Sequence, residues 1–275
     1  MWAWLPEELL QRIAHGLIAG KSASELRIVA GLDRRSCAIA QVHLDNMKAL
    51  LQAPFSLAAR DILGGMSRLN MHRRNIQSHH VQLLGAAIAS GALPPLKELI
   101  LYTNQIGDTG ISSLANAVFN GTLASLKTLD LQSNKIGDAG MTAFADAVGK
   151  GAFASLEMLS LELNQIGDVG MEALADALGK GAMAQCTHLY LYQNQIGDVG
   201  VTALADAVGK GALPALEQLW LDNNAIGDAG ISALADALGK GALASLKTLY
   251  VDDGPLGTEH PALKAACEAH GIELP

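Results

Sequence analysis

Asparagine, aspartate and glycine recur in this sequence at a spacing that could bind a phosphate group or a metal ion. The stretch NQIGDVG occupies residues 164–170 and again 194–200, and NQIGDTG occupies 104–110. Carboxylate and amide oxygens are ligands of hard cations, and glycine-rich turns that open helices bind phosphate. These loops are therefore either ligand sites or turns that the fold itself requires.

The regular spacing of the loops favours the structural role. Their asparagines stand thirty residues apart, without insertion or deletion, at Asn104, Asn134, Asn164, Asn194 and Asn224. Each lies in the template L-x-x-L-x-L-x-x-N-x-I-G-D-x-G, followed by apolar residues at helical spacing. With degraded copies before and after, residues 66–275 form seven units of thirty residues whose first and last members are atypical. Such regularity is typical of stacked repeats.

Each unit has the pattern of a strand, a turn and a helix. Leu159 and Leu161 alternate with Ser160 and Glu162, so we expect the leucines in the core and the polar pair on the concave, solvent-facing side. Residues 171–178 then place apolar side chains on one face of a helix. Every unit can therefore add one strand and one helix to a common core.

Stacking such units requires curvature. Parallel strands lie ~4.8 Å apart whereas packed helices need ~10 Å, so the strands must take the inner side. The predicted fold is an α/β solenoid, a curved horseshoe with an inner parallel sheet and outer helices. An α-helical N-terminal cap is expected over residues 1–65.

The polar loop residues have structural roles in this arrangement. Each aspartate stands just before its helical pattern, so we predict that its side chain caps the helix of its own unit. Ser78 and Thr258 hold this position in the end units, and both are capping residue types, so Asp168→Ser is expected to be nearly neutral. The asparagine amide is predicted to pair with backbone groups that the inward turn leaves without partners.

These motifs resemble the leucine-rich repeats, and specifically the ribonuclease-inhibitor-like class with long helical units. The segment N-x-I-G-D-x-G-x-x-A-L-A-x-A-L, from Asn224 to Leu238, is also similar to repeats of NOD-like immune receptors and of the Ran GTPase-activating protein. The resemblance implies a scaffold that binds a partner protein on its concave face. As an alternative, the second similarity implies a protein that activates a GTPase or regulates another enzyme.

Large rings and carboxylates stand at the concave positions, where comparison between units shows free variation. Aromatic anchors of this kind are typical of binding hot spots. The alternative is that exposed strand positions drift, because Tyr and Trp are ordinary strand formers. The candidate partner-binding residues are Tyr102, Asp130, Glu162, Tyr190, Tyr192, Trp220, Asp222, Tyr250 and Asp252.

Charge and composition restrict the class of partner. Residues 1–80 hold ten Lys and Arg against six Asp and Glu, whereas residues 81–275 hold nine against twenty-one. The acidic array favours a basic or neutral protein and disfavours nucleic acid and anionic membrane. With no apolar run of membrane-spanning length and with Cys186 at a leucine position of the core, we expect a cytoplasmic or nuclear protein.

The N-terminal segment allows two interpretations. It could shield the open end of the solenoid, as a stacked array requires. It also resembles an F-box, which implies docking on the adaptor of a cullin-type ubiquitin ligase while the array selects the substrate. The resemblance is carried by the motif L-P-x-E-L-L-x-x-I-x-x-x-L at residues 5–17, followed by Leu26, Val29 and the basic pair Arg34 and Arg35. The candidate adaptor contacts are Leu5, Pro6, Leu9 and Ile13.

Enzyme motifs are weak by comparison. The stretch GLIAGKS at residues 16–22 imitates a phosphate-binding loop but has three residues between its glycines where four are required. The histidines show no metal-ligand spacing with Glu or Cys. We therefore expect no enzyme activity, no catalytic residue, no metal and no cofactor.

Overall fold

Strands and helices alternate along the part of the chain that the structure describes. The structure is a computed structural model, and it describes residues 67–89, 93, 95–118, 122–252 and 257–275. The predicted N-terminal cap, with Leu5, Pro6, Leu9 and Ile13, lies outside the described residues. The expected F-box is therefore a sequence-based hypothesis only.

The described residues form seven strands and seven helices. The strands are β1 (Arg68–Asn70), β2 (Glu98–Ile100), β3 (Thr128–Asp130), β4 (Met158–Ser160), β5 (His188–Tyr190), β6 (Gln218–Trp220) and β7 (Thr248–Tyr250). The helices are α5 (Ser78–Ala89), α6 (Gly107–Ala117), α7 (Asp138–Gly149), α8 (Asp168–Gly179), α9 (Asp198–Gly209), α10 (Asp228–Gly239) and α11 (Pro261–His270).

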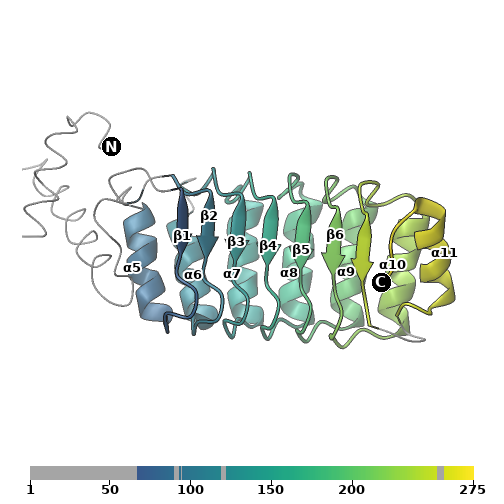
Figure 1. The fold of residues 1–275 in the computed structure, drawn as a ribbon, viewed down its shortest axis with the longest axis horizontal. Coiled ribbons are helices and arrows are strands. Elements are labelled where there is room, and N and C mark those ends of the chain that lie inside the picture. The colour runs from purple at the N-terminus through teal and green to yellow at the C-terminus, as the bar shows by residue number, and fades with distance from the viewer. Residues whose placement is uncertain (1–66, 90–92, 94, 119–121, 253–256) are drawn as a thin grey trace, which may run out of the picture.

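The strands form one open parallel sheet in sequence order. Each residue pairs with the residue thirty positions further on, as Leu159 does with Leu189. Figure 1 shows the helices behind the sheet, and the row of helices reaches beyond the row of strands at both ends. The strands thus occupy the shorter, inner side of a solenoid, as the different widths of strands and helices require.

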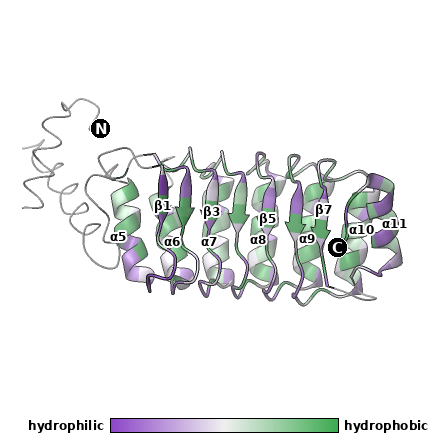
Figure 2. Cartoon of the chain, in the orientation of Figure 1, coloured by the Kyte–Doolittle hydropathy of each residue, from purple (hydrophilic) through white to green (hydrophobic). Residues whose placement is uncertain are grey.

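The core lies between the two layers. Strands and helices each carry both hydrophobic and hydrophilic residues (Figure 2), as elements with one buried face do. The side chains of Leu159 and Leu161 are 0% and 1% exposed, so the predicted register is confirmed. Cys186 is fully buried, which confirms its prediction as a small core residue.

The repeated asparagine links neighbouring repeats as predicted. The Asn164 amide donates to the carbonyls of Leu161 and Leu131 at 2.9 and 3.1 Å. Its Oδ1 accepts from the backbone N–H groups of Asn134 and Ile136, both at 3.0 Å. Because these backbone groups lie at a buried turn, Asn164 replaces hydrogen bonds that the strand cannot supply.

The prediction that each aspartate caps its own helix is wrong. In α8 the N-cap is Gly167, with no side-chain cap bond, and Asp168 is the first helical residue. Oδ1 of Asp168 instead accepts from the N–H groups of Gly197 and Gly200, both at 2.8 Å, at the start of α9. Asp138 and Asp198 make the same pair of bonds one repeat earlier and later. The carboxylate therefore caps the helix of the following repeat.

The two glycines of each loop make room for this carboxylate. A Cβ added at Gly200 would lie 2.9 Å from both Oδ1 of Asp168 and Cβ of Met171. A Cβ at Gly197 would lie 3.0 Å from Oδ2 of the same aspartate. The repeated loop is thus a contact between repeats, in which the groups that suggested a phosphate or metal site bind one another.

The C-terminal segment departs from the repeat pattern and covers the last strand. The helix cap of α11 is His260 rather than Thr258, and Nε2 of His260 lies 3.2 Å from Oδ1 of Asp228. Beyond α11, Glu273 pairs with β7, accepting from the N–H of Leu249 at 2.9 Å and donating to the carbonyl of Lys247 at 2.8 Å. The pairing occupies the edge of β7, which would otherwise offer unpaired backbone groups.

The capping of one repeat by the previous one can be tested by removing a single carboxylate. Asp168→Ala should lower the free energy of unfolding by about 2–3 kcal/mol, because two amides lose a charged acceptor. Asp168→Ser should also be destabilising, since a hydroxyl is shorter and uncharged. The control Asp176→Ala removes an exposed carboxylate of the same helix, and should change stability by less than about 0.5 kcal/mol. Equal effects of Asp168→Ala and Asp176→Ala in urea unfolding would contradict this role.

Candidate partner-binding face

The side of the sheet opposite the helices, called here the strand face, has no described element in front of it (Figure 1). One row of its residues is in strand register: Asn70, Ile100, Asp130, Ser160, Tyr190, Trp220 and Tyr250. The parallel hydrogen bonding continues past the strand ends, where Leu163 N–H donates to the Tyr192 carbonyl at 3.1 Å. The predicted site residues therefore lie in two adjacent rows across the sheet.

Four rings form a continuous aromatic patch, defined as Tyr190, Tyr192, Trp220 and Tyr250. The Trp220 ring is central, with centroid distances of 4.6 Å to Tyr190, 5.7 Å to Tyr192 and 4.7 Å to Tyr250. The rings come from neighbouring strands and are tilted relative to one another by 45–59°. All four are partly exposed, so the patch presents ring edges and faces to solvent.

Asp222 and Asp252 lie beside the patch but have hydrogen bonds of their own. Oδ1 of Asp252 accepts from the backbone N–H of Asn223 at 2.5 Å. Oδ2 of Asp222 accepts from the Asn223 side chain at 2.8 Å. These carboxylates hold the loop that follows β6, and any contact with a partner would add to that role.

Ser160 and Glu162 differ from their predicted exposure. Both are on the strand face, but only 5% of Ser160 and 7% of Glu162 is exposed. The strands are close enough for the large tyrosines of the next repeat to cover smaller neighbours, and Ser160 pairs directly with Tyr190. The side chains at the centre of the face are thus less exposed than the sequence pattern indicates.

Glu162 is a carboxylate with little compensation for its burial. Its Oε2 is buried and has no hydrogen-bond partner among the described residues. Burial, the largest cause, together with the nearby charge of Asp130, raises the pKa of Glu162 from 4.5 to about 7, although a hydrogen bond from its own backbone N–H opposes the shift. Burial also raises the pKa of Asp130, although the N–H of Gln132 bonds to it at 3.2 Å and opposes the shift. The two carboxyls therefore form a poorly solvated acidic pair.

The aromatic patch adjoins this pair. Burial raises the pKa of Tyr190 and of Tyr192, and the charge of Glu162 adds to the shift in each. Trp220 contributes a second unsatisfied polar atom, since its indole N–H is buried without an acceptor in the described part of the chain. Unpaired buried polar groups are rare in proteins and commonly mark functional sites.

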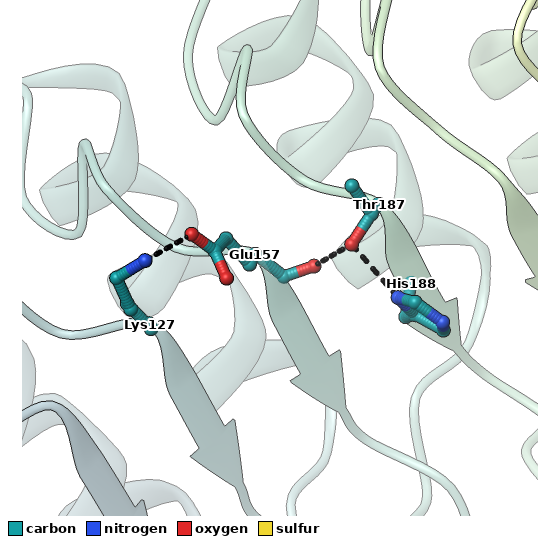
Figure 3. Close-up of polar contacts among 4 residues, drawn as sticks. All are labelled: Lys127, Glu157, Thr187 and His188. Atoms are coloured by element: carbon teal, nitrogen blue, oxygen red, sulfur yellow. Dashed lines mark hydrogen bonds and ion pairs between the residues drawn. The ribbon is translucent and has the colours of Figure 1, made fainter.

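Two lysines beside the strands, Lys127 and Lys247, are already paired with other carboxylates. Lys127 Nζ lies 2.5 Å from Glu157 Oε1, while the Thr187 hydroxyl bonds to the Glu157 carbonyl and to His188 (Figure 3). Lys247 Nζ lies 2.8 Å from Glu217 Oε2 in the same row. These pairs sit at the amino ends of the strands, so their cations neutralise that edge of the sheet.

One predicted site residue is separate from the others. Tyr102 stacks on His72, with ring centroids 4.7 Å apart, near the N-terminal end of the sheet. His188 and Gln218, which the repeat pattern did not single out, also touch the patch: the His188 ring is 6.0 Å from that of Tyr190, whose hydroxyl donates to Gln218 Oε1 at 3.1 Å.

Leu163, an apolar residue beside Glu162 that is 40% exposed, was likewise not among the predicted site residues. The other units carry Thr103, Ser133, Gln193 and Asn223 at this position. Leu163 is thus an apolar residue in an otherwise polar row, and this difference is visible in the sequence.

The described residues give no support to other kinds of site. None of their helices combines the length and the apolar run needed to cross a bilayer. Within the same residues, no three His, Cys, Asp or Glu side chains gather as metal ligands would. The strand face is the part of the described surface where unpaired polar atoms and large rings meet.

Fold and face together define a repeat solenoid with an open sheet. A family model described as a leucine-rich repeat matches residues 92–115, 122–145, 154–175, 187–205 and 214–235. These segments are the strand, turn and first helical turns of successive units. The chain is therefore a leucine-rich repeat protein. A search of curated proteins gave no match to the sequence.

Solved leucine-rich repeat structures show limited similarity. The ectodomain of the Arabidopsis thaliana receptor kinase GASSHO1/SCHENGEN3, solved with CASPARIAN STRIP INTEGRITY FACTOR 2, is 17% identical over 62% of this chain and 19% of its own, with a TM-score of 0.34. The Arabidopsis HAESA ectodomain, solved with an IDA peptide hormone, is 14% identical over 78% and 46%, with a TM-score of 0.33. Listeria monocytogenes internalin InlF is 15% identical over 86% and 96%, with a TM-score of 0.21. These similarities are too low to bear on function.

The raised pKa of Glu162 has a consequence for stability. The folded protein holds the proton more tightly than the unfolded chain, so the stability linked to this group is complete below pH 4.5 and lost as the pH rises through about 7. Glu162→Gln carries no charge and should be about 1–3 kcal/mol more stable than the unmodified protein at pH 8, but nearly equal to it at pH 4. Chemical unfolding at both pH values measures this. The control is Glu172→Gln, which changes an exposed carboxylate on α8; a pH-independent difference for Glu162→Gln would refute the assignment.

Proposed function

We propose that the chain is a non-enzymatic scaffold that binds a partner protein on the strand face. The observation that carries this proposal is the contact of four partly exposed rings, from three consecutive repeats, on an open sheet. Rigid aromatic anchors are the commonest energetic centres of protein interfaces. Solenoids in general use the inner surface of the stack for binding, because it is extended and rigid.

The division between constant and variable positions supports the proposal. Residues that join the repeats, such as Asn164 and Asp168, recur in every central unit and are used in hydrogen bonds within the protein. The strand-face rows change in size and charge from one unit to the next. The scaffold therefore leaves one surface on which side chains are not fixed by the fold.

The charge of the face favours a basic or neutral partner. Asp130, Glu162 and Asp222 stand in the two rows, and neither row contains a lysine or arginine from residue 100 onward. Nucleic acid and anionic membranes would be repelled. An intracellular, reducing location is consistent with the buried free thiols of Cys186 and Cys267.

The finer assignments follow from resemblances in the sequence. Thirty-residue units with helices of 10–12 residues favour the ribonuclease-inhibitor-like class of repeat. Docking of a ubiquitin-ligase adaptor through Leu5, Pro6, Leu9 and Ile13 is the alternative that follows from the F-box resemblance. Regulation of a GTPase follows from the similarity to the Ran GTPase-activating protein, and no residue of this chain is assigned to that role.

Truncation of the aromatic patch tests the proposal. The double variant Trp220→Ala, Tyr250→Ala should lose partner proteins captured by the unmodified chain, because loss of a hot-spot ring commonly costs about 2 kcal/mol or more, roughly thirtyfold in affinity. The control variant Val199→Ser changes a side chain on α9 that is 54% exposed. It should still capture the same partner proteins. Quantitative mass spectrometry of the captured proteins compares the three chains.

Stability measurements accompany the capture. Leu221 is fully buried, so Leu221→Ala should lower the free energy of unfolding by about 2–5 kcal/mol, and the patch variants should lower it by less. If the folded double variant captures the same proteins at the same level as the unmodified chain, the partner binds elsewhere and the proposal is wrong.

A further inference from the structure

Glu162 is the most unusual polar residue of the strand face. It is 7% exposed, its Oε2 has no hydrogen-bond partner among the described residues, and a second carboxyl, that of Asp130, lies nearby. A buried carboxylate is costly unless a cation or several donors compensate it. The backbone N–H of Glu162 itself compensates this cost in part, but Oε2 has no donor in the described part of the chain.

Two lysines near this row are engaged at the edge of the sheet, whereas the exposed Lys135 lies in the loop beyond the row. Lys127, one repeat earlier, pairs with Glu157 at 2.5 Å, and Lys247 pairs with Glu217 at 2.8 Å. Both pairs stand five residues before the row that contains Glu162. They therefore lie at the amino ends of the strands, whereas Glu162 lies at the carboxyl ends. The centre of the face is therefore left with negative charge, and neither row contains a lysine or arginine.

We propose that Glu162 receives an arginine or lysine side chain of the partner protein, with the apolar stem of that side chain lying against Tyr192 and the exposed Leu163. This inference rests on the proposed binding function and names the group that the face recognises. A cation would supply the donors that Oε2 lacks, and its charge would be shared by Asp130. Arginine suits the site better than lysine, because its planar group can stack on a ring while it donates to a carboxylate.

The surroundings permit entry of such a side chain. Leu163 and the partly exposed Tyr192 lie side by side, joined by the backbone bond from Leu163 N–H to the Tyr192 carbonyl at 3.1 Å. Solvent-facing rings change rotamer within nanoseconds, so the carboxylate can be uncovered as the partner arrives. The buried indole N–H of Trp220, also unpaired, offers a donor to a partner carbonyl at the next strand.

The proposal predicts a dependence on pH as well as on charge. The groups coupled to Glu162 are Asp130 on β3, and Tyr190 and Tyr192 on the β5 side. Asp222 acts on Tyr192, and His72 acts on Asp130. With the Glu162 pKa at about 7, the carboxylate goes from mostly protonated at pH 6 to mostly ionised at pH 8. Binding of a cation should therefore tighten by roughly tenfold over this range.

The experiment uses synthetic peptides as the probe. A random peptide library displayed on phage is selected on the full chain at pH 8, and clones that bind Trp220→Ala equally well are removed. A histidine-free peptide from the remainder is made with its arginine, and again with citrulline, which has the same shape without the charge. If the selected peptide carries a lysine in place of the arginine, it is compared with the same peptide carrying norleucine.

Dissociation constants are then measured for the unmodified chain, Glu162→Gln and the control Glu172→Gln. The charged peptide should bind the unmodified chain and Glu172→Gln at least tenfold more tightly than its neutral counterpart. With Glu162→Gln the preference and the pH dependence should both disappear, which a double-mutant cycle isolates as direct coupling.

The outcomes separate this inference from the proposed function. Peptides that need Trp220, but prefer no cation or keep the preference with Glu162→Gln, would overturn the inference and leave binding on the strand face intact. If no selected peptide is weakened by Trp220→Ala, the inference fails, while the capture experiment with the double variant decides the proposed function independently. Coupling between the cation and Glu162 is the result that supports the inference.

Discussion

The structure depends on satisfying backbone amides where each strand turns into a helix. A turn buried between stacked repeats leaves N–H and carbonyl groups that neither sheet nor helix can pair. Asn164 and Asp168 illustrate the solution, since each reaches into an adjacent repeat to bond with its backbone. Because every repeat relies on its neighbour for these bonds, insertion of a single residue would break the contact on both sides.

This constraint explains why the loops are so similar and the strand face so varied. Asparagine, aspartate and the two glycines are each fixed by a contact, and the leucines are fixed by the core. The outward positions of the strands supply none of the repeated Asn and Asp bonds that join the repeats, so they can carry rings such as Trp220 or carboxylates such as Glu162. A costly, unpaired carboxylate at the centre of that face fits a surface selected for binding at the expense of stability.

The sequence was sufficient to predict the repeats, the strand register and the asparagine bonds, because these follow from a period of thirty and from alternation of leucine. It also predicted that the rings of Tyr190, Trp220 and Tyr250 lie together, since equal positions in successive repeats must be neighbours. It did not predict which helix Asp168 caps. The sequence position of Asp168 is compatible with capping either α8 or α9. Only the packing of the repeats shows that the glycine amides of α9 lie closer to the carboxylate.

The burial of Glu162 could not be predicted from the sequence, for a related reason. Alternation assigned it to the solvent-facing side, and it lies there, but its exposure depends on the sizes and rotamers of side chains on neighbouring strands. The same applies to Asp252, whose bond to Asn223 depends on a loop conformation. Such properties arise from contacts across repeats rather than from the pattern within one.

Hydrogen exchange followed at single amides tests the central claim that Asn and Asp side chains join the repeats. The amides of Ile166, Gly197 and Gly200, which donate to side chains of a neighbouring repeat, should exchange as slowly as the core amide of Leu161, which bonds to the Tyr190 carbonyl just after β4, near the limit set by global unfolding. Exchange of these amides within about tenfold of the rate in an unstructured peptide, while Leu161 stays protected, would contradict the claim.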